Sequence, residues 1–154
     1  MPGLLNYTTS IPAGKTIGEM QTALAGAGAL SIAVHYTGGS PAGLTFSLTT
    51  KYGPQLFTLP VDVPAVQRVL RKQRSAGGMS RVKFESAAHA ERVAWRISKT
   101  WLEAQLALVK VEMATIDQVM LPYMHVGPDQ TMYAAYLENR DVLAITAGGD
   151  DDDQ

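Results

Sequence analysis

The chain contains no cysteine among its 154 residues. This absence excludes disulfide bonds, thiolate metal ligands and a cysteine nucleophile, and it is typical of proteins that remain in a reducing compartment. Long apolar runs are also missing, because no stretch approaches the roughly 20 residues that cross a bilayer as a helix. The first residues carry neither a charged segment nor an apolar core of the secretory type, so we expect no signal peptide and a cytoplasmic location.

Charged residues are also scarce, at 18% of the chain, whereas hydrophobic residues make up 46%. This balance is typical of a globular protein and excludes an intrinsically disordered one. A chain of this length is close to the commonest size of a single domain and can bury a core without disulfides or metals. We therefore expect one domain over residues 1–145, followed by a disordered acidic tail over residues 146–154.

The net charge of −1 conceals a separation of opposite charges along the chain. Residues 100–154 carry ten acids against two basic side chains, and residues 68–99 carry nine basic side chains against two acids. The nine are Arg68, Arg71, Lys72, Arg74, Arg81, Lys83, Arg92, Arg96 and Lys99. A basic middle and an acidic end indicate a polyanionic partner, self-association, or pairing within the chain.

Hydrophobic alternation and turn residues predict the elements of the first half. A loosely alternating run over residues 4–11 predicts a strand, and Thr16 followed by Glu19 predicts a capping box at the start of a helix. Strict alternation, interrupted by glycine- and proline-containing turns, predicts three further strands joined as an antiparallel meander, over residues 30–36, 44–48 and 56–61. Asp62, just before Pro64, predicts the start of a helix that ends near residue 74.

The second half is predicted to be helical. Residues 75–80 form a glycine-containing break that we expect to be mobile, and residues 86–114 form a long helix with Trp101 in its apolar stripe. Thr115 and Gln118 predict a capping box for a short helix, and Asp129 is expected to cap a last one. The predicted fold is α+β, with an N-terminal β-α-β-β-β-α antiparallel sheet unit covered by the long helix and two short helices.

Motifs for catalysis or metal binding are not evident. Residues 14–16 (GKT) lack the preceding glycine of a phosphate-binding loop, because Thr9 occupies that position. The histidines at 35, 89 and 125 are far apart and have no metal-ligand spacing, and no serine stands in a nucleophile elbow. We therefore predict a protein that is not an enzyme, with no catalytic residues, no metal and no cofactor.

The basic middle segment is the best candidate for a binding site. Arg92, Arg96 and Lys99 lie on one face of the predicted long helix, and the other basic residues crowd the end of the preceding helix and its loop. If these two elements pack side by side, their charges form one surface that neutralises several phosphates of a nucleic acid. The alternative is a solvated face that pairs within the chain, beginning with an ion pair between Lys99 and Glu103.

One combination of residues forms a recognisable pattern. It consists of residues 90–97 (AERVAWRI) with Lys99, Trp101 and residues 103–105 (EAQ), closed by residues 121–124 (LPYM), and it extends to residues 7–9 (YTT), 15–17 (KTI) and 57–60 (FTLP). This pattern resembles a family of small proteins of tailed bacteriophages and prophages, and the resemblance covers most of the chain. It implies a phage origin, and with it the host cytoplasm, but no particular activity.

Three functions are compatible with these features. The leading hypothesis is an accessory phage protein that binds nucleic acid, either single-stranded or double-stranded, in DNA replication or recombination. The predicted core is also similar to that of phage single-strand annealing proteins, which is an analogy of fold alone. The second hypothesis is an anti-defence protein that sequesters a signalling nucleotide or binds a host protein. The third is a structural or assembly protein whose opposite charges form contacts in a homo-oligomer.

Overall fold

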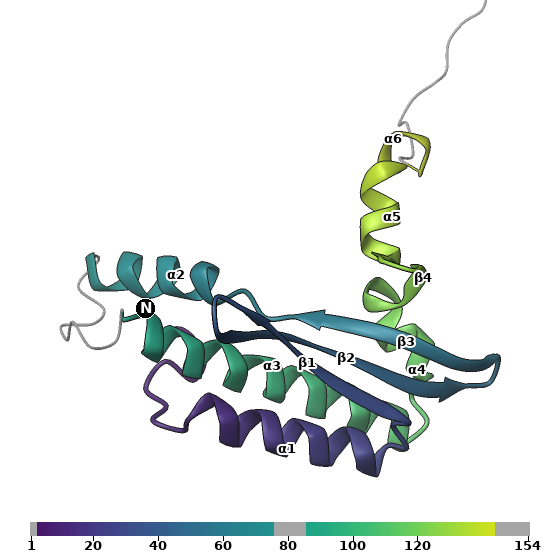
Figure 1. Cartoon of the computed structure of the whole chain (residues 1–154), viewed down its shortest axis with the longest axis horizontal. Coiled ribbons are helices and arrows are strands. Elements are labelled where there is room, and N and C mark those ends of the chain that lie inside the picture. The colour runs from purple at the N-terminus through teal and green to yellow at the C-terminus, as the bar shows by residue number, and fades with distance from the viewer. Residues whose placement is uncertain (1–2, 76–85, 144–154) are drawn as a thin grey trace, which may run out of the picture.

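The computed structural model describes residues 3–75 and 86–143, and it has the predicted α+β fold. A helix and three strands come first, and the remaining elements are helices apart from one short hairpin (Figure 1). In chain order the elements are α1 (Ala13–Gly26), β1 (Ser31–Thr37), β2 (Ser40–Thr50), β3 (Gly53–Pro60), α2 (Val63–Ser75), α3 (Ala87–Lys110), α4 (Ile116–Met120), η2 (Leu121–Tyr123), β4 (His125–Gly127), β5 (Gln130–Thr131), α5 (Met132–Glu138) and α6 (Arg140–Leu143).

The three strands β1, β2 and β3 form the predicted antiparallel meander in that order. Gly38 and Gly39 connect β1 to β2 with φ angles of 58° and 84°. A two-residue hairpin turn that matches the twist of its strands needs positive φ at both positions, and glycine adopts it without steric cost. The next hairpin pairs β2 with β3 and places Phe46 beside Phe57, with ring centroids 5.7 Å apart.

The core lies between one face of the sheet and the helices α1 and α3, which run side by side beneath the strands (Figure 1). Alternate residues of β2 and β3 point into it and are buried. Trp95 of α3 is fully buried at its centre and donates a hydrogen bond from Nε1 to the carbonyl of Pro41 at 3.3 Å. Trp101, expected in the core, is only half-buried and packs edge-on against Tyr123, with ring centroids 5.4 Å apart.

The predicted first strand over residues 4–11 is wrong. The segment forms turns instead, with the amide of Tyr7 bonded to the carbonyl of Leu4 at 3.0 Å. Asn6 adopts a φ of 62°, which reverses the chain direction and cannot continue a strand. The sheet unit is therefore α-β-β-β-α.

The predicted capping box at Thr16 and Glu19 is also wrong, because the N-cap of α1 is Pro12, four residues before Thr16. Thr16 is buried inside the helix, and Glu19 contacts Arg96 of α3. Further along the chain, Asp62 does cap α2 by accepting the amide of Ala65 at 3.0 Å, as predicted.

The long helix α3 ends at Lys110, earlier than the predicted residue 114. Glu112 follows with a φ of 62°, a left-handed conformation that terminates helices. The predicted capping box at Thr115 and Gln118 is confirmed at the start of α4. Asp129 caps no helix, because Thr131 accepts the amide of Ala134 at 3.3 Å and begins α5 after an unpredicted hairpin of β4 and β5.

The C-terminal helices α5 and α6 form an arm that projects away from the body (Figure 1). Tyr133, Tyr136 and Leu137 on α5 are each exposed. Residues 76–80 of the predicted mobile loop and the whole of the predicted acidic tail lie outside the described residues, and Ser75 is the last residue of α2. None of the helices in the described ranges is long and apolar enough to cross a membrane.

The two edges of the sheet differ. Met124, just before β4, forms an isolated antiparallel bridge with Phe57 of β3. Within the described part of the chain, β1 has no strand partner other than β2. Its sequence, SIAVHYT, contains no proline, lysine, arginine or carboxylate. An edge strand of this kind lacks the residues by which many proteins prevent strand pairing between molecules.

Candidate functional site

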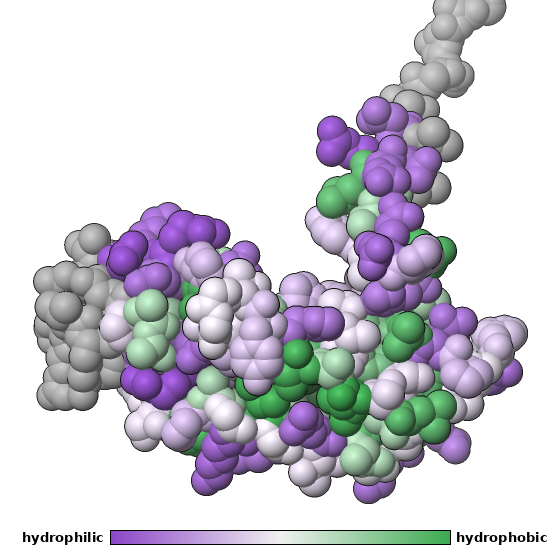
Figure 2. All heavy atoms as spheres, in the orientation of Figure 1, coloured by the Kyte–Doolittle hydropathy of each residue, from purple (hydrophilic) through white to green (hydrophobic). Residues whose placement is uncertain are grey.

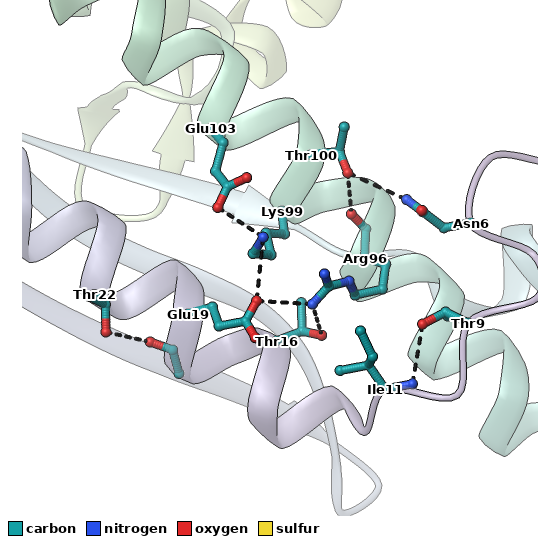
Figure 3. Close-up of polar contacts among 11 residues, drawn as sticks. Asn6, Thr9, Ile11, Thr16, Glu19, Thr22, Arg96, Lys99, Thr100 and Glu103 are labelled. Atoms are coloured by element: carbon teal, nitrogen blue, oxygen red, sulfur yellow. Dashed lines mark hydrogen bonds and ion pairs between the residues drawn. The ribbon is translucent and has the colours of Figure 1, made fainter.

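Two members of the predicted basic set, Arg96 and Lys99, have acidic partners (Figure 3). Arg96 Nη1 donates to Glu19 Oε2 of α1 at 3.0 Å and to the Thr16 hydroxyl at 3.3 Å. Lys99 Nζ lies 3.3 Å from the same oxygen of Glu19 and 2.9 Å from Glu103 Oε1, which confirms the predicted ion pair within the helix. Only 18% of the Arg96 side chain and 15% of the Lys99 side chain are exposed, so both cations are compensated within the fold.

The ionisation of this cluster fits a structural role. Partial desolvation acts to raise the pKa of Glu19, but hydrogen bonds from Arg96 and Lys99 outweigh it and hold the pKa below its ordinary value. The hydrogen bond to Glu103 raises the pKa of Lys99 against desolvation, and Glu19 adds to the increase. The charged forms of Glu19 and Lys99 are therefore favoured by their opposite-charge partners where α1 meets α3.

Arg92, one turn before Arg96, is half-buried. Its Nε atom is buried and has no hydrogen-bond partner among the described residues. The predicted row on α3 thus exists, but it is embedded in the body rather than spread over a free surface.

The basic residues of α2 are placed differently. Arg68, Arg71 and Lys72 are exposed, while Leu70 between them is fully buried against Ala90 and Val93 of α3. Hydrophilic residues gather over α2 in Figure 2. The side chain of Arg74 and the whole of Arg81 and Lys83 lie outside the described residues.

The basic residues of α2 do not form one surface with those of α3, because α2 and the basic row lie on different sides of α3. Arg96 and Lys99 point to α1, whereas Ala90, Val93 and Ile97 face α2. At 3.6 residues per turn, the centres of these two groups lie roughly 120° apart around α3, although Val93 and Arg96 are only one turn apart. Among the predicted residues, the structure thus brings Arg68, Arg71 and Lys72 together and separates them from the row on α3.

A second polar array, not predicted, crosses the outer face of the sheet. His35 Nε2 of β1 contacts the hydroxyl of Thr45 on β2, and this hydroxyl lies 2.8 Å from that of Thr58 on β3. Thr58 Oγ1 in turn lies 2.6 Å from His125 Nε2 of β4. His35 and His125, which are far apart in the sequence, are thus linked through two threonine hydroxyls without touching each other. Alternation places Thr45 on the outer face, but the strand register and β4 that complete the row are not readable from the sequence.

The third histidine, His89, has a structural environment. It is 3% exposed in the first turn of α3, and its Nε2 contacts the carbonyl of Tyr7. Ser86 caps the same helix by accepting the His89 amide at 3.1 Å. Within residues 3–75 and 86–143, no group of three or more histidine or carboxylate side chains could hold a metal ion.

No protein-family model matches the chain, and no match is found among curated proteins or solved structures.

Proposed function

We propose that the protein is a non-enzymatic phage accessory protein that binds nucleic acid in DNA metabolism through the exposed basic face of α2. The supporting observation is the placement of Arg68 and Lys72, which are exposed, one helical turn apart, and without an acidic partner in the described part of the chain. Arg71 is exposed on the same helix. Phosphate contacts from such side chains supply most of the affinity of proteins for nucleic-acid backbones.

The face of α2 is preferred to the row on α3 for an electrostatic reason. A phosphate that approached Arg96 or Lys99 would compete with Glu19, which already accepts from both. The same phosphate would meet no such competition at Arg68 or Lys72. Arg74 also belongs to α2, and Arg81 and Lys83 follow α2 in the sequence, so this stretch of the chain has the highest density of basic residues.

Exposed aromatic surface near the start of α2 favours a single strand. Tyr36, 66% exposed, lies near the end of β1, and Pro41 is its partner on β2. Val61, at the start of the connection to α2, bonds to the carbonyl of Ala42 next to this position. Unpaired bases stack on exposed aromatic rings, whereas duplex bases are already stacked on each other.

Anisotropy of a short fluorescein-labelled DNA strand of mixed sequence, titrated at several salt concentrations, tests the proposal. Replacing both Arg68 and Lys72 by glutamine should weaken binding and lower the log–log salt slope by about 1 to 2 units, since each phosphate contact contributes a little under one unit. The matched control, Lys15→Gln with Arg140→Gln, removes the same charge elsewhere and should retain the wild-type slope. Absence of binding by the wild-type protein at low salt would contradict the proposal.

The other two hypotheses remain proposals of lower rank. A trap for a signalling nucleotide requires arginines that converge on an enclosed pocket, and Arg68 and Lys72 lie on an exposed helix face instead. An assembly role requires a contact between copies. In the anisotropy experiment, a nucleotide trap would bind polymers weakly, and an assembly protein would bind them only through its net charge.

A further inference from the structure

A groove of about 740 Å³ lies where α1 and α3 end, beside the far end of β2. Its walls include small residues of both helices, Ala23 and Gly26 of α1 and Ala107 of α3. Leu48 of β2 and Leu106 of α3 contribute apolar surface to the same groove. The volume falls within the range typical of pockets for small molecules.

The groove is open because the sequence places small side chains where large ones would close it. A methyl group added at Gly26 would meet no atom within 4 Å. Ala107 is exposed on α3, so nothing covers this side of the wall. Apolar surface left in water costs about 25 cal/mol per Å², and a ligand with an apolar body would recover that free energy.

The rim carries four charged side chains, but two of them already have partners. Glu103 is paired with Lys99 at 2.9 Å. The pKa of Asp117 is held below its ordinary value by hydrogen bonding, first from Thr115, and by the nearby charge of Lys51. Both acids are thus engaged before a ligand arrives.

The two lysines of the rim are less engaged. Lys51 Nζ lies over the Tyr52 ring, 5.1 Å from its centroid. Lys110 has no acidic partner within ion-pair distance among residues 3–75 and 86–143. The groove therefore presents apolar walls and two ammonium groups: Lys51 lies close enough to Asp117 to lower the pKa of that carboxyl, and Lys110 has no ion-pair partner in the described part of the chain.

Carbonyls at the ends of the two helices are already hydrogen-bonded, although each helix C-terminus still presents a partial negative charge to the groove. The amide of Ala29 bonds to the carbonyl of Leu24 at 2.9 Å, and the amide of Met113 bonds to that of Leu108 at 2.9 Å. These bonds occupy carbonyls of each last turn that a bound cation would otherwise contact.

We propose that this groove binds a small amphipathic anion. Its apolar body lies against Leu48 and Leu106, and its carboxylate, sulfonate or phosphate group lies near Lys51 and Lys110. The site is separate from the basic face of α2. Ala90, which packs in the cluster with α2, precedes Ala107 by 17 positions on α3, about 25 Å at the rise of an α-helix.

Fluorescence titration of the full-length protein with anilinonaphthalene sulfonate tests the proposal. This probe has an aromatic body and one sulfonate, and decanoate should displace it. Decylammonium, with the same chain length and the opposite charge, should displace it at least about tenfold less well, a difference of about 1.4 kcal/mol. Equal displacement by the two would overturn the anionic specificity.

Two variants locate the probe within the molecule. Ala107→Trp fills the groove from an exposed helix position and should weaken probe binding about tenfold or more, whereas wild-type affinity would overturn the proposal. Lys51→Gln combined with Lys110→Gln should weaken it about five- to tenfold, because each exposed ion pair contributes up to about 1 kcal/mol. Lys15→Gln, at the opposite end of α1, should leave it unchanged.

A melting curve for each variant shows whether it is folded. If Ala107→Trp does not fold, the lysine variant and the decanoate comparison still decide the outcome. Loss of DNA binding in the α2 variant, with probe binding retained, would separate the two sites. Failure of DNA binding by the wild-type protein would leave the probe experiment unaffected, so each proposal can fail alone.

Discussion

His35 and His125, which are far apart in the chain, are the two ends of one hydrogen-bonded row across the outer face of the sheet. The row contains three contacts, and Thr45 and Thr58 supply only two hydroxyl protons between them. The third proton must come from an imidazole. If both rings are neutral, one therefore donates from Nε2 and the other accepts there, so their tautomers are coupled.

Replacing Thr45 by valine should uncouple the two rings. Valine has nearly the shape of threonine but no hydroxyl, so Thr58 loses its partner and the proton on His125 redistributes between Nδ1 and Nε2. Long-range ¹⁵N–¹H NMR spectra of the imidazoles report this change at a residue that the substitution does not touch. Thr49→Val, on the same strand but outside the row, is the control, and an unchanged His125 spectrum in Thr45→Val would refute the coupling.

The two tryptophans should differ in their contribution to stability. Trp95 is fully buried, so Trp95→Ala should lower the free energy of unfolding by about 3–5 kcal/mol, as for a large aromatic removed from a core. Trp101 is half-buried, and Trp101→Ala should cost about half as much. Urea denaturation followed by circular dichroism gives both values. A larger loss at Trp101 than at Trp95 would contradict the packing of α3.

The cluster around Glu19 predicts the pH dependence of stability. The pKa of Glu19 is below its ordinary 4.5 in the folded protein. The contribution of Glu19 to the free energy of unfolding is therefore complete above pH 4.5 and is lost as the pH falls through the folded pKa. The pKa of Lys99 is above its ordinary 10.5, so its contribution is present below that value and is lost as the pH rises through the folded pKa.

Melting temperatures measured from acid to neutral pH test this prediction. Glu19→Gln should lower the melting temperature at neutral pH and should flatten its decline in acid. Glu138→Gln removes the same charge from α5, where the carboxylate accepts a hydrogen bond from Gln130, and should leave the acid decline as in the wild type. A Glu19→Gln curve parallel to the wild-type curve would show that the ion pairs contribute nothing.

The ends of α1 and α3 offer a matched pair of substitutions. A residue of positive φ stands two positions after the last residue of each helix, Gly28 at 94° after α1 and Glu112 at 62° after α3. A side chain in this conformation costs about 1 kcal/mol, so Gly28→Ala should destabilise by about that amount and Glu112→Gly should stabilise by about 0.5–1 kcal/mol. Glu112→Gln keeps the strain while removing the charge, and a gain as large as that of glycine would assign the effect to charge instead.

The elements that the sequence predicted well depend on local signals. The alternation of β1 to β3 and the capping residues Asp62 and Thr115 each act within a few positions, and the structure confirms them. The first segment failed because Asn6 turns the chain, which alternation does not encode. The early start of α1 after Pro12 reflects packing, since Ala13, its first residue, is buried.

The candidate site was harder to predict because it depends on pairing between distant elements. Periodicity correctly placed Arg92, Arg96 and Lys99 on one face of a helix, but only the tertiary structure shows that Glu19 compensates two of them. Likewise, no spacing rule predicts that His35 and His125 lie on one hydrogen-bonded row. The row depends on the register of three strands and on a hairpin that has only five strand residues.

The open edge of β1 has a consequence for handling the protein. Its uncharged residues offer a second molecule a strand to pair with, so repulsion between copies must come from charge elsewhere. The net charge is only −1 at pH 7 and vanishes near the isoelectric point of 6.3. Self-association should therefore be strongest in slightly acidic buffer, and raising the pH by about two units above that point should keep the molecules apart.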